Sequence, residues 1–228
     1  MTVKNAAAPP YTDVVAEDFA GRSIYSVLDL YVAFDQRELH EQSRDMTTFT
    51  TPLGPFRLTV LPMGWTNSPA VLQGDITHIL KPEIPHWTKP FANDVPIAGP
   101  ATRYERPDGS YETVPGNPGI RRFVWEHLEV VHRIIQRVKA YGATFAGKKS
   151  FIGVPEAEIV GHLCTYEGHI VDPKRIKVIQ DWPVPTNLTE VRAFLGTCHW
   201  GRGHLETGDY MLGTFRAHVH LSHNVTGG

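Results

Sequence analysis

The 228-residue sequence has only two cysteines, Cys164 and Cys198, and this scarcity excludes a fold held together by disulfides. It has no run of about 18 apolar residues that could cross a membrane, and its first residues lack the apolar core of a secretory signal. Its cysteines and histidines form no pair at the spacing of a structural zinc site. We therefore expect an intracellular protein, cytoplasmic or nuclear, without a membrane partner.

Strong charge of one sign is also missing, because the formal net charge is -2. The charge is nevertheless uneven. Between Arg121 and Lys177 there are ten Lys and Arg against six Asp and Glu, a local excess of four. Such a stretch is either a solvated helix face with loops or a surface that contacts phosphates, and both interpretations stay open.

Two strand-like runs contain polar residues that would be costly to bury. Residues 24–30 carry Asp29 among apolar and aromatic residues, and residues 91–97 carry Asn93 and Asp94 in a similar setting. A buried polar group costs several kcal/mol unless it is bound. If the two strands pair side by side, Asp29 and Asp94 meet and can hold a metal ion.

Other patterns predict a mixture of helices and antiparallel strands, an α+β fold. Residues 47–51 and 56–61 have the composition of a hairpin. Ser68 and Pro69 begin a helix that we expect to end near Leu80. The clearest helical pattern places apolar residues at spacings of four, three, four and three before Gly142. These residues are Val124, Leu128, Val131, Ile135 and Val138. Residues 143–147 predict a strand or turn, 159–164 a strand, and 174–182 and 188–195 two short helices.

Taken in order, the blocks of this sequence resemble the reverse transcriptase domain of gypsy-type long-terminal-repeat retroelements, over roughly residues 1–197. Residues 28–36 are similar to the first catalytic block of that family, which implies that Asp29 binds metal and Phe34 acts as the sugar gate. Residues 61–70 with Gln73 resemble the block beneath the incoming nucleotide and the template, which includes Gly64 and implies that Gln73 contacts the template. Few other families carry that string.

Three further blocks extend the resemblance. Residues 91–94 stand where the family has an aromatic residue, any residue and two aspartates, so Asn93 replaces the first catalytic aspartate. Residues 145–151 resemble the block with a nucleotide-facing lysine, Lys148 or Lys149. Residues 160–162 resemble the primer grip, which implies roles for Gly161 and His162, and residues 182–185 and 191–196 look like the thumb.

The resemblance implies a polymerase palm, an antiparallel sheet backed by helices, with partial fingers and a short helical thumb. Residues 1–22 would be an extended lead-in from the fingers and 23–165 the palm with partial fingers, including an exposed loop at 100–122. Residues 166–197 would be the thumb and connection, and 198–228 an irregular tail. The family's basic fingers block would lie before Met1.

The implied function is RNA-directed DNA polymerisation by two-metal nucleotidyl transfer. It would use Mg²⁺ or Mn²⁺, deoxynucleoside triphosphates, and an RNA or DNA template with its primer. Asn93 and the absent fingers block predict that the reaction is impaired. The alternative is a catalytically silent, nucleic-acid-binding remnant.

Several of these residues also have a plainer interpretation. Phe34 could pack in the core, and Gln73 could be a polar residue on a helix surface. Lys148 and Lys149 could simply be solvated. Asn93 suits a tight turn whatever its chemical role.

Overall fold

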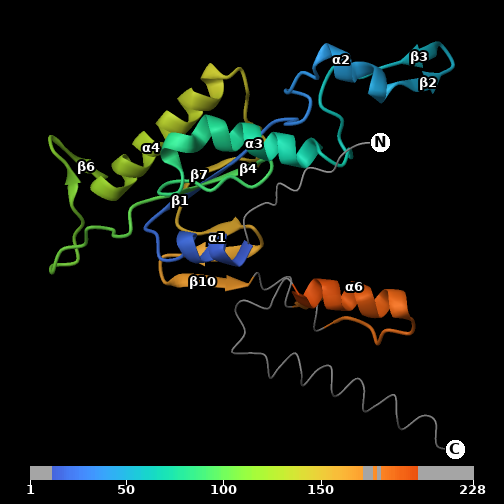
Figure 1. Cartoon of the computed structure of the whole chain (residues 1–228). Coiled ribbons are helices and arrows are strands. Elements are labelled where there is room, and N and C mark those ends of the chain that lie inside the picture. The colour runs from blue at the N-terminus through green and yellow to red at the C-terminus, as the bar shows by residue number, and fades with distance from the viewer. Residues whose placement is uncertain (1–11, 172–176, 179–180, 200–228) are drawn as a thin grey trace, which may run out of the picture.

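The computed structural model describes residues 12–171, 177–178 and 181–199 (Figure 1). The helices are α1 (Thr12–Phe19), α2 (Glu41–Arg44), α3 (Ser68–Leu80), α4 (Arg122–Ala140) and α6 (Leu188–His199), with short 3-10 turns at Asp45–Thr47, Lys81–Glu83 and Gly147–Lys149. The strands are β1 (Tyr25–Asp29), β2 (Phe49–Thr51), β3 (Gly54–Phe56), β4 (Asp94–Ala98), β5 (Thr113–Val114), β6 (Asn117–Arg121), β7 (Phe151–Val154), β8 (Ala157–Ile159), β9 (His162–Thr165) and β10 (Gly168–Val171). None of the helices in these ranges combines the length and apolarity that a membrane span needs.

A three-stranded antiparallel sheet in the order β4-β1-β7 lies at the centre of the fold. Figure 1 shows α3 and α4 along one side of this sheet and α1 with β10 on the other. Both sides are packed with apolar side chains. Leu28, Val95, Ile97, Ile76 and Ile134 belong to the core under α3 and α4, and burying such side chains is the main favourable contribution to folding.

The second side of the sheet is covered by the β10-β9-β8 sheet and α1. Val15 and Phe19 of α1 are buried there with Tyr25 and Cys164. The lead-in expected before residue 22 therefore contains a helix that belongs to the core, because Val15 and Phe19, four positions apart, face the same way. Residues 1–11 lie outside the described part.

Helix α3 confirms the predicted range, and it begins with proline in its first turn. Helix α4 is also found, and part of its predicted stripe is confirmed, because Val131 and Val138 are buried and Ile135 packs against the core. The buried residues are Phe123, His127, Val130, Val131, Ile134 and Val138. Leu128 is 41% exposed, so its assignment to the core is wrong. Four of the buried residues each precede a predicted residue by one position, so the centre of the buried face is rotated towards them around the helix axis.

The predicted strand at 159–164 is in fact two strands. β8 and β9 form a hairpin in which Ile159 pairs with His162. Val160 and Gly161 make the turn, with φ values of 45° and 85°. The apolar run conceals this turn because Val160 is a β-branched residue that rarely adopts a positive φ.

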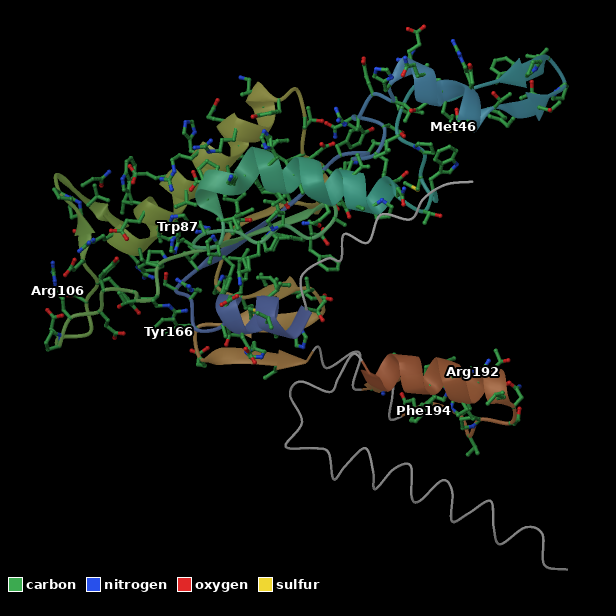
Figure 2. All side chains as sticks on the ribbon, in the orientation of Figure 1. Met46, Trp87, Arg106, Tyr166, Arg192 and Phe194 are labelled. Carbon is green, nitrogen blue, oxygen red and sulfur yellow. The ribbon has the colours of Figure 1, made fainter. Side chains whose placement is uncertain are left out.

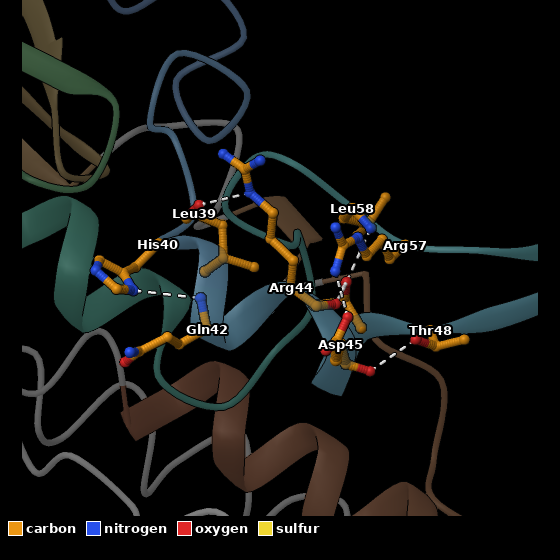
Figure 3. Close-up of polar contacts among 9 residues, drawn as sticks. Leu39, His40, Gln42, Arg44, Asp45, Thr48, Arg57 and Leu58 are labelled. Carbon is orange, nitrogen blue, oxygen red and sulfur yellow. Dashed lines mark hydrogen bonds and ion pairs between the residues drawn. The ribbon is translucent and has the colours of Figure 1, made fainter.

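A small unit, α2 with β2 and β3, stands apart from the central sheet (Figure 1). It is the predicted hairpin, although β3 ends at Phe56 rather than near residue 61. Its polar contacts are local. Arg57 pairs with Asp45, and Arg44 Nε donates to the carbonyl of Leu39 at 2.9 Å (Figure 3). Figure 2 shows Met46 on this unit, and its side chain is exposed.

Residues 100–122 project at the other end of the molecule, where Figure 2 labels Arg106. This segment was expected to be an exposed loop, and it contains the β5-β6 hairpin. Arg121 stacks on the ring of Tyr111 at 4.5 Å and Arg122 on that of Tyr104 at 4.1 Å. Cation–π contacts of this kind order a segment that has little apolar core of its own.

Helix α6 extends four residues beyond its predicted end, to His199. Trp182 packs against Phe194 with ring centroids 5.8 Å apart. Asn187 and Glu190 cap the helix start, since Asn187 Oδ1 accepts from the Glu190 amide at 2.9 Å. Most of the helix predicted at 174–182, and the tail from residue 200, lie outside the described residues.

Candidate active site

Asp29, Asn93 and Asp94 come together where β1 and β4 meet. The two strands are antiparallel, with Asp29 directly opposite Asp94 in the register. This confirms the predicted pairing of the two strands. Opposite residues of an antiparallel pair lie on one face of the sheet and close together.

A tight turn before β4 places Asn93 over the end of β1. Phe91 and Asp94 exchange two backbone hydrogen bonds of 2.9 Å, and the turn residue Ala92 has a φ of 53°. The carbonyl of Asn93 accepts from the Leu30 amide at 2.8 Å. The turn is therefore attached to β1 next to Asp29.

The Asp29 carboxylate has two polar neighbours. Asn93 Nδ2 donates to Asp29 Oδ2 at 3.2 Å, and Lys149 Nζ lies 4.0 Å from the same oxygen. The Asp29 backbone is fixed as well, because its carbonyl accepts from the Ala146 amide at 2.7 Å. Ser150 Oγ accepts from its amide at 3.3 Å.

Asp94 is in a less favourable electrostatic environment. Burial raises its pKa, and the negative charge of Asp29 raises it further. Lys149 opposes these effects, and Glu158 adds to them. A carboxylate whose ionisation is disfavoured by a neighbouring carboxylate is a common arrangement at a cation site, because a bound cation offsets the repulsion.

The residues at this point fit a hard divalent cation. Asp29 and Asp94 offer carboxylate oxygens and Asn93 an amide carbonyl, and oxygen is the ligand that Mg²⁺ prefers. Within the described ranges no group of three or more His, Cys, Asp or Glu side chains could hold a metal. The family that the sequence resembles has two consecutive aspartates at positions 93 and 94. Because Asn93 replaces the first of them, this site has one carboxylate fewer.

Two cavities flank the aspartates. The first, of about 640 Å³, is lined by Asp29, Phe34, Met63, Asn93 and the lysine segment including Lys148 and Lys149. The second, of about 650 Å³, is lined by Asp94, Phe91, Phe151, Glu158 and the turn of Val160 and Gly161. The structure therefore separates the residues predicted to contact nucleotide from the predicted primer grip, with the carboxylates between them.

Gln73 lines neither cavity. Its Oε1 accepts from the Ala92 amide at 2.8 Å, and its Nε2 donates to the Pro90 carbonyl at 2.9 Å. The side chain thus holds the backbone of the Asn93 turn. Neither predicted interpretation, a helix-surface residue or a template contact, describes these two bonds.

The remaining predicted residues are placed as follows. Gly64 has a φ of 87° in the exposed turn beside Met63. Met63, which lines the first cavity, was missed, although it stands within the block that pointed to Gly64. His162 is buried in β9, where its ring lies 5.9 Å from that of His169. Of the two residues predicted to form the primer grip, Gly161 lines the second cavity and His162 does not.

Backbone strain is concentrated around these cavities. Four non-glycine residues of the described chain have positive φ, and three of them, Val32, Ala92 and Val160, border the site. The fourth, Tyr104, lies in the segment that projects away. Strain of this kind persists where the surrounding structure enforces it, and it is frequent at functional sites.

Comparison with known proteins agrees with this geometry. Residues 6–164 match the sequence model of the family described as reverse transcriptase (RNA-dependent DNA polymerase). The Pol polyprotein of transposon 412 from Drosophila melanogaster is 26% identical over 193 residues, which cover 85% of this chain and 14% of that protein. The Pol polyprotein of transposon gypsy from the same fly is 20% identical over 201 residues, 88% of this chain and 17% of that protein.

Solved structures show the same fold. A foamy viral protease-reverse transcriptase in complex with an RNA/DNA hybrid is similar with a TM-score of 0.67 and 23% identity, over 88% of this chain and 24% of that one. The same viral enzyme with double-stranded DNA gives a TM-score of 0.70 and 23% identity, over 88% and 31%. The chain spans less than a fifth of the length of the transposon polyproteins named above. It is a palm-type α+β domain, and it belongs to the reverse transcriptase family.

Proposed function

We propose that this domain is the palm of an RNA-directed DNA polymerase whose metal site is weakened by Asn93. The observation that carries the proposal is the meeting of Asp29, Asn93 and Asp94 between two cavities. An in-line transfer needs the nucleotide on one side of the reacting point and the primer end on the other. Two cavities that meet at a pair of carboxylates suit that requirement.

In this proposal Asp29 and Asp94 hold Mg²⁺ or Mn²⁺, with the Asn93 carbonyl as a neutral third ligand. When bound, the cation supplies positive charge that stabilises the transferred phosphoryl group and the leaving pyrophosphate. Lys148 and Lys149 hold the triphosphate in the first cavity, and Phe34 excludes the 2′-hydroxyl of a ribonucleotide. Gly161 supports the primer end in the second cavity, and His162 fixes the turn from beneath.

The partners in this proposal are a primer on an RNA or DNA template and deoxynucleoside triphosphates, inside the cell, in the cytoplasm or nucleus. The basic excess between Arg121 and Lys177 would contact phosphates. Because each neutralised phosphate releases counterions, binding should weaken steeply as salt rises. If the affinity for primer-template does not change between low and moderate salt, the basic stretch is only a solvated face.

Compared with an aspartate at this position, Asn93 lowers the negative charge beside the cation. It also directs a hydrogen-bond donor, instead of a metal ligand, towards Asp29. Its amide donates to Asp29, whereas a metal would require its carbonyl to turn inward. If the loss slows chemistry a thousandfold, the barrier has risen by about 4 kcal/mol. Asn93→Asp should therefore raise the rate of primer extension and strengthen Mg²⁺ binding.

The test is primer extension on an RNA template by the parental chain and Asn93→Asp, each with Mg²⁺ and with Mn²⁺. Asp29→Asn in both backgrounds is the matched control, because it removes a ligand without changing size. Extension that depends on Asp29 and rises with Asn93→Asp supports the proposal. Salt-sensitive binding of primer-template without extension in either background would instead indicate the catalytically silent remnant.

A further inference from the structure

Gln36 connects two segments that are far apart in the sequence and that both contribute residues to the lining of the first cavity. Its Nε2 donates to the carbonyl of Tyr31 and, at 3.3 Å, to that of Thr144. Its Oε1 accepts from the Thr144 amide at 2.7 Å. The side-chain amide thus uses both its donor and its acceptor on the backbone of Thr144, which is 108 positions away in the sequence.

The two connected segments carry the groups that would contact a nucleotide. The turn after Tyr31 carries Phe34, and the segment after Thr144 leads to Lys148 and Lys149. The backbone begins their association, because the Tyr31 amide donates to the Thr144 carbonyl at 3.0 Å. Leu30 and Phe145 also form an isolated antiparallel bridge. Gln36 adds side-chain hydrogen bonds next to this short backbone pairing and so links the two segments more firmly.

The turn that Gln36 holds is strained at Val32, which has a φ of 45°. A β-branched residue avoids this conformation unless its neighbours impose it. Two contacts do so. The Asp35 amide donates to the Val32 carbonyl at 2.9 Å, and Gln36 binds the carbonyl of Tyr31, immediately before Val32. Without the bonds of Gln36 the turn would have one constraint fewer, and the strained backbone at Val32 could relax to a more favourable φ.

We propose that Gln36 is a positioning residue that sets the separation between Phe34 and the lysine segment, and so the selection of deoxynucleotides over ribonucleotides. The inference rests on the proposed function, because it assigns the nucleotide to the first cavity. Gln36 would touch no substrate. It acts through Phe34, whose distance from the sugar is fixed only while the turn is held.

The chemistry of the clamp makes the amide hard to replace. Alanine removes both the donor and the acceptor. Glutamate keeps an acceptor for the Thr144 amide but directs a carboxylate at the carbonyls of Tyr31 and Thr144, which it cannot donate to when ionised. Gln36→Ala and Gln36→Glu should therefore both open the cavity although they differ in charge.

The experiment compares these two variants with the parental chain and with Gln136→Ala, which changes an exposed glutamine on α4. Amide hydrogen exchange at Thr144 and neighbouring residues reports the clamp without any ligand. Fluorescently labelled deoxynucleoside and ribonucleoside triphosphates, titrated with Mg²⁺ onto the full chain bound to a dideoxy-terminated primer on its template, report nucleotide selection.

We expect faster exchange of the Thr144 amide in Gln36→Ala, which removes the acceptor of that amide, and a smaller change in Gln36→Glu, which keeps an acceptor. Gln136→Ala should leave the exchange of that amide unchanged. The affinity for deoxynucleotides should fall about tenfold, which is the size of effect expected from the loss of one hydrogen bond. The affinity for ribonucleotides should fall less. The ratio of the two affinities is decisive, because a merely structural role would weaken both equally.

Three outcomes would overturn the role. Unchanged exchange of the Thr144 amide in Gln36→Ala would mean that Gln36 does not hold the segments in solution. Faster exchange with an unchanged affinity ratio would reduce Gln36 to a structural clamp. A parental chain that binds neither nucleotide would overturn the proposed function together with this role, and it would be recognised before any variant is made.

Discussion

The stability of this domain should fall between pH 6.5 and 4 because of one buried histidine. His127 of α4 is fully buried, and its Nε2 lies 2.6 Å from Ser26 Oγ on β1. The Gly153 amide donates to the same hydroxyl oxygen at 3.0 Å, so the hydroxyl hydrogen is available to a neutral imidazole. Burial lowers the pKa of His127 from 6.5 to about 4, although backbone contacts to Ala98 and Tyr25 act in the opposite direction.

The sign and size of the effect follow from this shift. In the unfolded chain the histidine takes up its proton near pH 6.5, whereas in the folded chain it resists until about pH 4. The contribution of the neutral ring is therefore fully present above pH 6.5 and is lost as the pH falls towards 4. At about 1.4 kcal/mol per pH unit the loss over this range is about 3 kcal/mol.

Urea denaturation at several pH values from 7.5 to 4.5 measures this loss directly. His127→Gln should remove most of it and flatten the dependence, since glutamine does not titrate. His132→Gln changes an exposed histidine on the same helix and should leave the dependence as it is. A His127→Gln chain that loses as much stability as the parent over this range would refute the reasoning. If that variant does not fold, the His127 imidazole can be titrated by NMR in the parental chain. A pKa near 6.5 for that imidazole would refute the reasoning equally.

Three more predictions concern parts of the fold that support the site. The carboxylate of Glu83 is 5% exposed and is held by Arg133 and Arg137; the hydrogen bond from Arg133 is the main reason that its pKa is lowered. Glu83→Gln should therefore lower the free energy of unfolding at pH 7 by about 1–3 kcal/mol in urea, less at a pH where glutamate would itself be protonated. Val32→Asn should raise the free energy of unfolding by about 1 kcal/mol, because asparagine accepts a positive φ, while Val32→Thr should bring no gain; equal effects of the two would show that strain is not the cause. Gln73→Leu should cost about 1–2 kcal/mol and expose the Ala92 amide to hydrogen exchange, and full protection of that amide in the variant would contradict the assigned bond.

Much of this architecture could be predicted from local pattern. Helix α3 follows from the proline in its first turn and from its apolar periodicity, and the strands around Asp29 and Asp94 follow from their apolar flanks, because propensity and periodicity act over a few residues. The ordered blocks of the family pointed to the pairing of β1 with β4. Where local pattern was ambiguous the prediction slipped, as with Leu128, since an apolar residue beside the true stripe of α4 fits the same spacing.

What the sequence by itself determined is which residues are gathered: two aspartates, an asparagine in place of a third, an aromatic residue and a lysine pair. Only the tertiary structure decided how they divide between two cavities and what holds them there. The bond from Asn93 to Asp29 joins residues 64 positions apart, and the bonds of Gln36 to Thr144 span 108. Such contacts depend on the path of the whole chain, and no local periodicity encodes them. A glutamine that clamps two backbones therefore looks, in the sequence, like any polar residue on a surface.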